Sequence, residues 1–144
     1  MSEAPVRVLF LCTHNSARSQ MAEALLRFIG GERFDVVSAG TEPGHVHPLA
    51  IRVMDEVGID LSAAHAKDVQ QFVGQDFDYV ITVCDRANES CPIFPGDPER
   101  IHWSFRDPSA VEGSDETRMA AFRKVRDELR QRLRTWVMVA ARPQ

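Results

Sequence analysis

The chain has 144 residues, of which 44% are hydrophobic, and this is enough for one domain around one buried core. A formal net charge of −4 argues against nucleic acid and against an anionic membrane surface as partners. No apolar run is long enough to span a bilayer or has the form of a signal peptide, so we expect no membrane association.

Hydrophobic periodicity predicts strands and helices in alternation along the chain. Glycines and prolines mark several element ends, as Gly30 and Gly31 do after the first helix. In chain order, the predicted elements are a strand at residues 7–11, a helix at 17–29, a strand at 34–38, helices at 48–57 and 64–72, strands at 79–84 and 101–104, and a final helix at 114–137. Residues 41–47 and 85–100 are predicted loops, the second with room for one helical turn.

This alternation predicts an α/β fold, with one doubly wound domain over residues 1–144 and a four-stranded parallel sheet that has helices on both faces. Ligands of such sheets bind beyond the carboxyl ends of the strands. The residues at or just after these ends include Cys12, Ser38, Cys84 and Ser104–Asp107. We therefore expect them to converge on one edge of the sheet.

The most informative segment is the loop between the first strand and the first helix, where five residues separate Cys12 from Arg18. The backbone N–H groups of such a loop and the helix dipole attract a tetrahedral oxyanion. The same field favours the nucleophilic thiolate of Cys12, and Arg18 can hold two oxygens of the anion. A lone cysteine is more often a buried apolar residue, but the combination favours an anion site. The candidate oxyanion-binding residues are Thr13, His14, Asn15, Ser16, Ala17, Arg18 and Ser19.

The two other cysteines, Cys84 and Cys91, are seven residues apart, with Cys91 in the polar, proline-rich loop. Seven residues of continuous helix span about 10.5 Å, whereas a disulfide needs Cα atoms within about 4.4–6.8 Å. A Cys84–Cys91 disulfide therefore requires the segment between them to unwind. The spacing does not suit zinc, and two unrelated cysteines remain an alternative. Three cysteines is an odd number for a secreted disulfide scaffold, which favours the cytoplasm.

Electron counting distinguishes two reactions for this set of residues. Hydrolysis of a phosphate ester needs one nucleophilic cysteine and an acid. Reduction of an oxyanion needs two electrons, which a dithiol supplies by becoming a disulfide, and arsenate is a reducible analogue of phosphate. Asp107 follows the last strand and precedes Pro108, so it is the candidate general acid, although an Asp-Pro pair is also common in plain turns.

Together these residues resemble the thioredoxin-coupled arsenate reductases, which have the fold of the low-molecular-weight tyrosine phosphatases. The resemblance covers nearly the whole chain, and the Cys84/Cys91 pair is its most discriminating part because phosphatases share the loop. Its motifs are Cys12–Ser19, Gln20–Glu23, Ser38–Gly40, Val83-Cys84, Cys91–Ile93, His102-Trp103 and Asp107-Pro108.

The resemblance implies arsenate as substrate, with phosphate or sulfate as mimics, thioredoxin as partner, and a monomer that requires no cofactor. Cys12 would attack arsenate held by Arg18, with Asp107 as acid. Cys84 would then attack Cys12, and Cys91 would attack Cys84. The alternatives are a low-molecular-weight protein tyrosine phosphatase and a non-enzymatic oxyanion sensor.

Some members of this family bind potassium beside the loop. The matching positions here are Asn15, Glu23, Ser38 and Asp68, which makes a potassium ion an expectation from the resemblance. His14 occupies a loop position that is often glycine in relatives, and we expect its side chain to face solvent at the rim of the site.

Overall fold

Strand β1 (Val6–Cys12) lies in the interior of the sheet, with β2 (Phe34–Gly40) on one side and β3 (Tyr79–Thr82) on the other. The computed structural model describes residues 4–140, and within them four parallel strands run in the order β2-β1-β3-β4, with β4 at Glu99–His102. The helices are α1 (Arg18–Gly30), α2 (Pro48–Asp55), α3 (Asp85–Glu89) and α4 (Asp115–Ala140), and the 3-10 turns are η1 (Gly31–Arg33), η2 (Val69–Phe72) and η3 (Pro108–Ala110).

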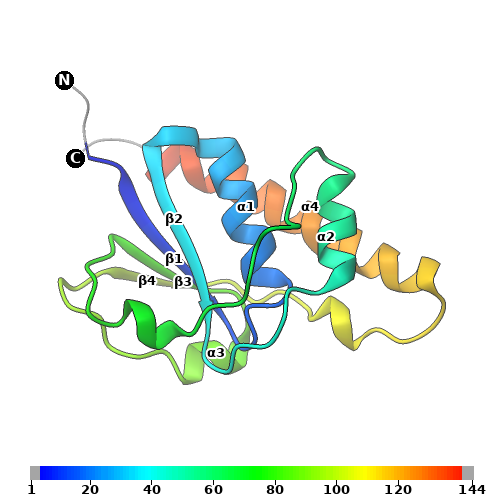
Figure 1. Ribbon diagram of the computed structural model, residues 1–144. Helices are drawn as coiled ribbons and strands as arrows, with labels where there is room; N and C mark the ends of the chain where they lie inside the picture. Colours follow the sequence, from blue (N-terminus) through cyan, green and yellow to red (C-terminus); the bar gives the residue numbers. More distant parts are fainter. Residues whose placement is uncertain (1–3, 141–144) are drawn as a thin grey trace.

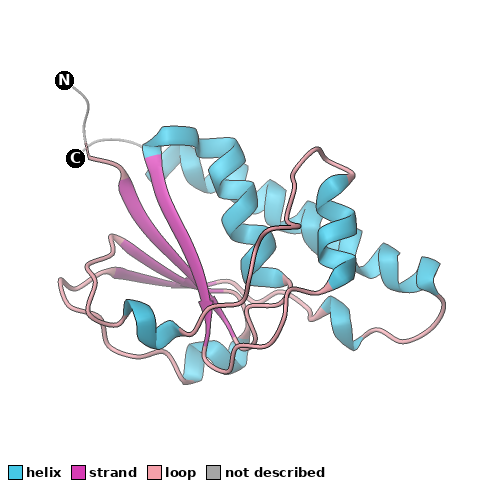
Figure 2. Ribbon diagram, viewed as in Figure 1, coloured by secondary structure: helices cyan, strands magenta, loops and turns pink. Residues whose placement is uncertain are grey.

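Both faces of this sheet are covered. Val8, Leu9, Phe10 and Leu11 of β1 are all fully buried, and successive strand residues point to opposite faces. Figure 1 shows α1 and α4 on one side of the strands and η2 and α3 on the other, and Figure 2 shows how the connections converge at the carboxyl ends. The predicted α/β fold with a four-stranded parallel sheet is therefore confirmed.

Helix α4 packs the apolar stripe that the sequence predicted against the rest of the core. Its buried side chains are Met119, Phe122, Val125, Leu129, Leu133, Val137 and Ala140, together with Arg126. Near its end, the Trp136 ring meets Tyr79 edge-on at 5.0 Å and Trp103 at 6.1 Å between centroids. These contacts fix α4 to β3 and to the loop that follows β4.

None of the helices described within residues 4–140 combines the length and the hydrophobicity that a membrane-spanning segment needs.

The helix predicted at residues 64–72 is wrong, because only the short turn η2 forms there. The Lys67 carbonyl accepts a hydrogen bond from Gly40 N at 2.8 Å, and Asp68 bridges Gly40 as a short extension of the sheet. The Lys67 N–H donates to Asn15 Oδ1 at 2.9 Å. These long-range bonds use the backbone groups that a helix would need, so tertiary contacts override the local preference.

Two arginines of α4 hold the end of α2 through Glu56. Arg123 Nη2 and Arg126 Nη1 each lie 2.8 Å from a Glu56 oxygen, and Arg126 is largely buried. The hydrogen bond from Arg123 is the main cause that lowers the pKa of Glu56 to about 2, with Arg126 adding to it. The ionised carboxylate is therefore the form that ties α2 to α4.

We predict that Glu56→Gln lowers the free energy of unfolding by up to about 1 kcal/mol near neutral pH, the upper range for an exposed ion pair. A carboxyl group whose pKa is lower in the folded than in the unfolded chain stabilises the folded protein at pH values above its unfolded-state pKa. The difference between the two proteins should thus shrink as the pH falls from about 4.5 towards about 2. Denaturant melts over this range measure it, with the exposed Glu112→Gln as control. A difference that is constant with pH would contradict the prediction.

Candidate active site

Four carbonyl groups of the Cys12–Arg18 loop accept hydrogen bonds from donors outside the loop. Four backbone N–H groups of residues 41–47 supply these bonds: Thr41 N to Cys12 O (3.2 Å), Glu42 N to Thr13 O (2.8 Å), Gly44 N to His14 O (3.0 Å) and His47 N to Ser16 O (2.9 Å). In a trans peptide the N–H points opposite to the C=O. The amides that follow these carbonyls therefore face inward, towards the Cys12 sulfur.

The sulfur of Cys12 lies at the centre of these donors. Asn15 N–H donates to Sγ at 3.2 Å, and the Ser19 hydroxyl lies 2.7 Å from it. Cys12 and Ser19 are both buried, and α1 begins directly after the loop. Hydrogen bonds and a helix N-terminus favour a negative charge here, either on the thiolate or on an oxyanion that replaces it as acceptor.

Asn15 fixes the shape of the loop from behind. Its backbone has φ 51°, a left-handed conformation that asparagine tolerates, and its side chain is fully buried. The amide Nδ2 donates to Ser19 Oγ (2.8 Å) and Ser38 Oγ (2.9 Å), while Oδ1 accepts from Gln20 Nε2 and Lys67 N (both 2.9 Å). Because all four positions have partners of the right polarity, the amide can take only one orientation.

Gly40, at the end of β2, lets the sheet approach the loop backbone closely. A Cβ added at Gly40 would lie 2.6 Å from Thr13 O and 2.9 Å from Asn15 N. These are backbone atoms, so the loop itself would have to move. From the sequence, Gly40 was recognised only as part of the Ser38–Gly40 motif, and nothing there indicated why a glycine is needed.

Arg18 and Asp107 meet across the mouth of the loop. Arg18 Nη1 donates to Phe105 O at 3.0 Å, which aims the guanidinium, and Nη2 lies 3.8 Å from Asp107 Oδ2. The other Asp107 oxygen, Oδ1, accepts from Ser109 N (3.0 Å) and Oγ (2.6 Å). A cavity of about 170 Å³ opens here, and its lining includes Cys12, Arg18 and Asp107. The predicted acid thus shares one cavity with the predicted nucleophile.

His14 lies exposed at the rim, as predicted, and its Nδ1 is 2.9 Å from Glu42 O. Ser16 and Ala17 also line this cavity, and Thr13 lines a neighbouring pocket together with Cys84. Phe105 and Ser109, which hold Arg18 and Asp107, were not singled out from the sequence. Their contribution comes through a backbone carbonyl and a short local turn, for which no residue pattern is specific.

Cys84 is buried beside the loop, with its Sγ 3.4 Å from Thr13 Oγ1. Cys91 is half-buried, its Sγ lies 3.5 Å from Pro92 O, and both thiols are free. Burial raises the pKa of the Cys91 thiol above its ordinary value, although nearby Arg100 opposes this. In this conformation the Cys91 side chain is therefore favoured as the protonated, less reactive thiol.

Helix α3 lies between these two cysteines, and the side chains of its first two residues hold it in place. Asp85 Oδ1 lies 2.8 Å from His102 Nε2, and His102 Nδ1 lies 2.8 Å from Thr82 Oγ1 on β3. Arg86 forms an exposed ion pair with Glu42 at 2.8 Å. A regular turn of helix keeps the cysteines apart, so a disulfide between them would require α3 to unwind and these contacts to break.

Three of the four residues matched to potassium lie together. Ser38 Oγ donates to Glu23 Oε1 at 2.6 Å, and Asn15 donates to the same hydroxyl. Asp68 instead uses its Oδ1 to accept from Gln70 N and cap η2. Among residues 4–140, no three His, Cys, Asp or Glu side chains form a group that could hold a metal ion.

Known proteins place this geometry in a family. A family model described as low molecular weight phosphotyrosine protein phosphatase matches residues 7–143. The chain belongs to this phosphatase family. It is 45% identical to an arsenate reductase of Halalkalibacterium halodurans over 129 residues, which are 90% of this chain and 93% of that protein.

Solved structures show the same similarity. An arsenate reductase in its oxidised state matches with a TM-score of 0.79 and 31% identity, over 93% of this chain and 98% of that one. The thioredoxin-dependent arsenate reductase of Corynebacterium glutamicum matches with a TM-score of 0.73 and 30% identity, over 97% of this chain and 64% of that one. The family that the sequence motifs resembled is thus confirmed.

For this phosphatase-family chain we predict that Gly40→Ala weakens phosphate binding about tenfold or more, because the added methyl displaces the loop amides. Isothermal titration calorimetry with inorganic phosphate measures the affinity. Gly74→Ala is the matched control, since a Cβ there meets nothing within 4 Å. Equal affinities for the two variants would show that the loop tolerates the methyl.

Proposed function

We propose that this protein reduces arsenate to arsenite with Cys12, Cys84 and Cys91 as a thiol relay. The observation that carries the proposal is the position of Cys84, whose buried sulfur lies 3.4 Å from the Thr13 hydroxyl of the oxyanion loop. A phosphatase needs no second thiol at this place. The arsenate reductases to which the chain is similar over most of its length support the same reaction.

The first step forms a covalent adduct. Arsenate lies against the inward amides and the Arg18 guanidinium, and the Cys12 thiolate attacks arsenic. An S–As bond forms while an As–O bond breaks, and the departing oxygen leaves as water with a proton from Asp107. Ser109 donates to Asp107 Oδ1, whereas Oδ2 lies 3.8 Å from the Arg18 guanidinium, so Oδ2 is the oxygen that would carry this proton.

The second and third steps form a disulfide at Cys12 and then transfer it to the Cys84–Cys91 pair. Cys84 attacks the Cys12 sulfur, a Cys12–Cys84 disulfide forms, and the S–As electron pair stays on arsenic, which leaves as arsenite. Cys91 then attacks Cys84, which forms the Cys84–Cys91 disulfide and returns the Cys12 thiolate. This last step needs α3 to unwind, since α3 occupies Asp85–Glu89 between the two thiols.

A dithiol partner such as thioredoxin would reduce the Cys84–Cys91 disulfide and reset the protein. The thioredoxin-dependent relative from Corynebacterium glutamicum supports this partner. Such a cycle suits a reducing compartment, and we propose the cytoplasm and a monomer. An assay of arsenate-dependent NADPH oxidation with thioredoxin and its reductase tests the function directly. No oxidation with arsenate would overturn it.

The second candidate is a protein tyrosine phosphatase, which the Cys12, Arg18 and Asp107 constellation also permits. It leaves the position of Cys84 without a role, so phosphatase activity is proposed only as a side reaction. An oxyanion sensor would need a partner-binding module, and the elements described over residues 4–140 already form the sheet and its cover.

The order of thiol attack predicts different outcomes for the two relay cysteines. Cys91→Ser should stop cycling with thioredoxin, yet one round of arsenate should trap a Cys12–Cys84 disulfide. Cys84→Ser should form neither disulfide and should keep hydrolysis of a small aryl phosphate. Non-reducing peptide mapping and aryl phosphate assays measure both. If both variants cycle normally with arsenate and thioredoxin, the relay is wrong.

Asp107→Asn should lower kcat for arsenate reduction about a hundredfold while changing phosphate affinity little, because a proton donor acts only as the oxygen departs. Steady-state kinetics and phosphate titration separate the two effects. A variant that loses phosphate affinity but keeps the turnover of bound substrate would make Asp107 a positioning residue.

A further inference from the structure

A chain of buried hydrogen bonds runs from the Cys12 sulfur to Glu23 on α1. It passes through the Ser19 hydroxyl, the Asn15 amide and the Ser38 hydroxyl, which donates to Glu23 Oε1 at 2.6 Å. Because Asn15 donates to both hydroxyls, Ser38 is free to donate to Glu23 and Ser19 is free to donate to sulfur. The direction of the whole chain therefore depends on Glu23 being an acceptor.

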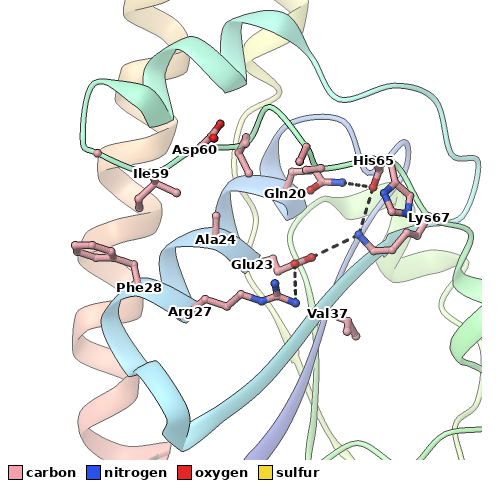
Figure 3. A pocket seen from close by; sticks show the side chains of 14 residues that line it. Gln20, Glu23, Ala24, Arg27, Phe28, Val37, Ile59, Asp60, His65 and Lys67 are labelled. Carbon is pink, nitrogen blue, oxygen red and sulfur yellow. Dashed lines mark hydrogen bonds and ion pairs between the residues drawn. The ribbon is translucent and has the colours of Figure 1, made fainter.

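Glu23 already has a cation at each oxygen. Lys67 Nζ lies 3.6 Å from Oε1, and Arg27 Nη2 lies 3.1 Å from Oε2. Figure 3 shows Glu23 reaching from α1 between these two side chains, with Lys67 extending from the segment that follows His65. The two ion pairs fix the position of the Glu23 side chain at the end of the chain of hydrogen bonds.

These residues do not fit a potassium ion. Such a cation needs oxygen lone pairs that point to one place. Both acceptor positions of Asn15 Oδ1 are taken by Gln20 Nε2 and by Lys67 N–H, and Asp68 caps η2. Within residues 4–140, no buried side-chain nitrogen or oxygen lacks a hydrogen-bond partner. No orphaned oxygen therefore marks a place for the ion.

Lys67 is better placed than Arg27 to act on this chain. The side chains of Lys67 and Glu23 are 17% and 13% exposed, whereas that of Arg27 is 58% exposed. Arg27 also donates to Val36 O through two nitrogens, and water screens its charge. Lys67 Nζ lies 3.3 Å from His65 O, which anchors the ammonium beside Oε1.

We propose that the Lys67 ammonium is the resident cation of this network and that the oxyanion loop of this protein works without potassium. Lys67 acts through two groups: its backbone N–H fixes the Asn15 amide, and its ammonium holds the Glu23 carboxylate beside Ser38. It is a positioning residue, since it reaches the sulfur only through other groups. Its effect on turnover rests on the proposed function, but its effect on oxyanion binding does not.

The test is calorimetric titration of inorganic phosphate into the full-length protein in choline chloride and in potassium chloride at equal ionic strength. The unmodified protein should bind phosphate equally in both salts, and this comparison needs no variant. Lys67→Gln should bind about tenfold more weakly in choline chloride, a typical size for coupling between two sites. Potassium chloride should not restore the affinity of this variant, because Gln20 and the backbone N–H of residue 67 still occupy Asn15 Oδ1.

Two further variants separate charge from shape. Lys124→Gln removes the only other lysine of the chain, which is exposed on α4, and should match the unmodified protein in both salts. Lys67→Arg keeps the charge and should retain affinity in choline chloride within about threefold. Thermal melts in both salts check that each variant is folded.

Several results would overturn the proposal. These are a several-fold gain in affinity of the unmodified protein in potassium chloride, an unchanged affinity of Lys67→Gln in choline chloride, or a loss that Lys67→Arg shares. Because the readout is phosphate binding, a failure of arsenate reduction would leave this test interpretable.

Discussion

The active site depends on one constraint: a loop that offers its amides to an anion must find other donors for its carbonyls. Buried carbonyls without partners are costly, so the loop cannot adopt this shape alone. Residues 41–47 supply four of the donors in register with the loop. The irregular segment after β2 is therefore needed to hold the loop in shape, although its backbone groups contact the side of the loop that faces away from the sulfur.

The close approach of these two segments explains why β2 ends in Gly40. The strand carries Ser38 into the Asn15 network, and two residues later it must pass within van der Waals contact of the loop backbone. A side chain at Gly40 would force the scaffold and the loop apart. The end of β2 thus determines two features of the site. Ser38 takes part in the hydrogen bonds of Asn15, and Gly40 sets the distance between the loop and residues 41–47.

The redox half of the site has the opposite physical character. Donors from residues 41–47 and the Asn15 side chain hold the loop, whereas α3 has only five residues, of which Ala87 alone is buried. Isolated helices of this length are unstable in water, so little free energy holds α3 in place. A segment of low local stability between two cysteines is what a disulfide that forms and breaks in each cycle requires.

Much of this protein is encoded in local patterns. The strand, the Cys12–Arg18 loop and the following helix could be predicted because apolar period, loop length and helix start lie within one stretch of chain. The α4 stripe and the placement of Asp107 followed from period and from strand ends in the same way. The spacing of Cys84 and Cys91 by itself predicted that a disulfide between them requires the intervening segment to unwind.

The tertiary structure decided what depends on residues far apart in the chain. The segment that was predicted as a helix at residues 64–72 is held in another conformation because Lys67 and Asp68 bond to Gly40 and Asn15. Lys67 lies 52 residues from Asn15, so no local pattern marks either its amide or its ammonium as part of the site. The sequence therefore determined which residues can do the chemistry, whereas hydrogen bonds between residues far apart in the chain decided much of what holds them in position.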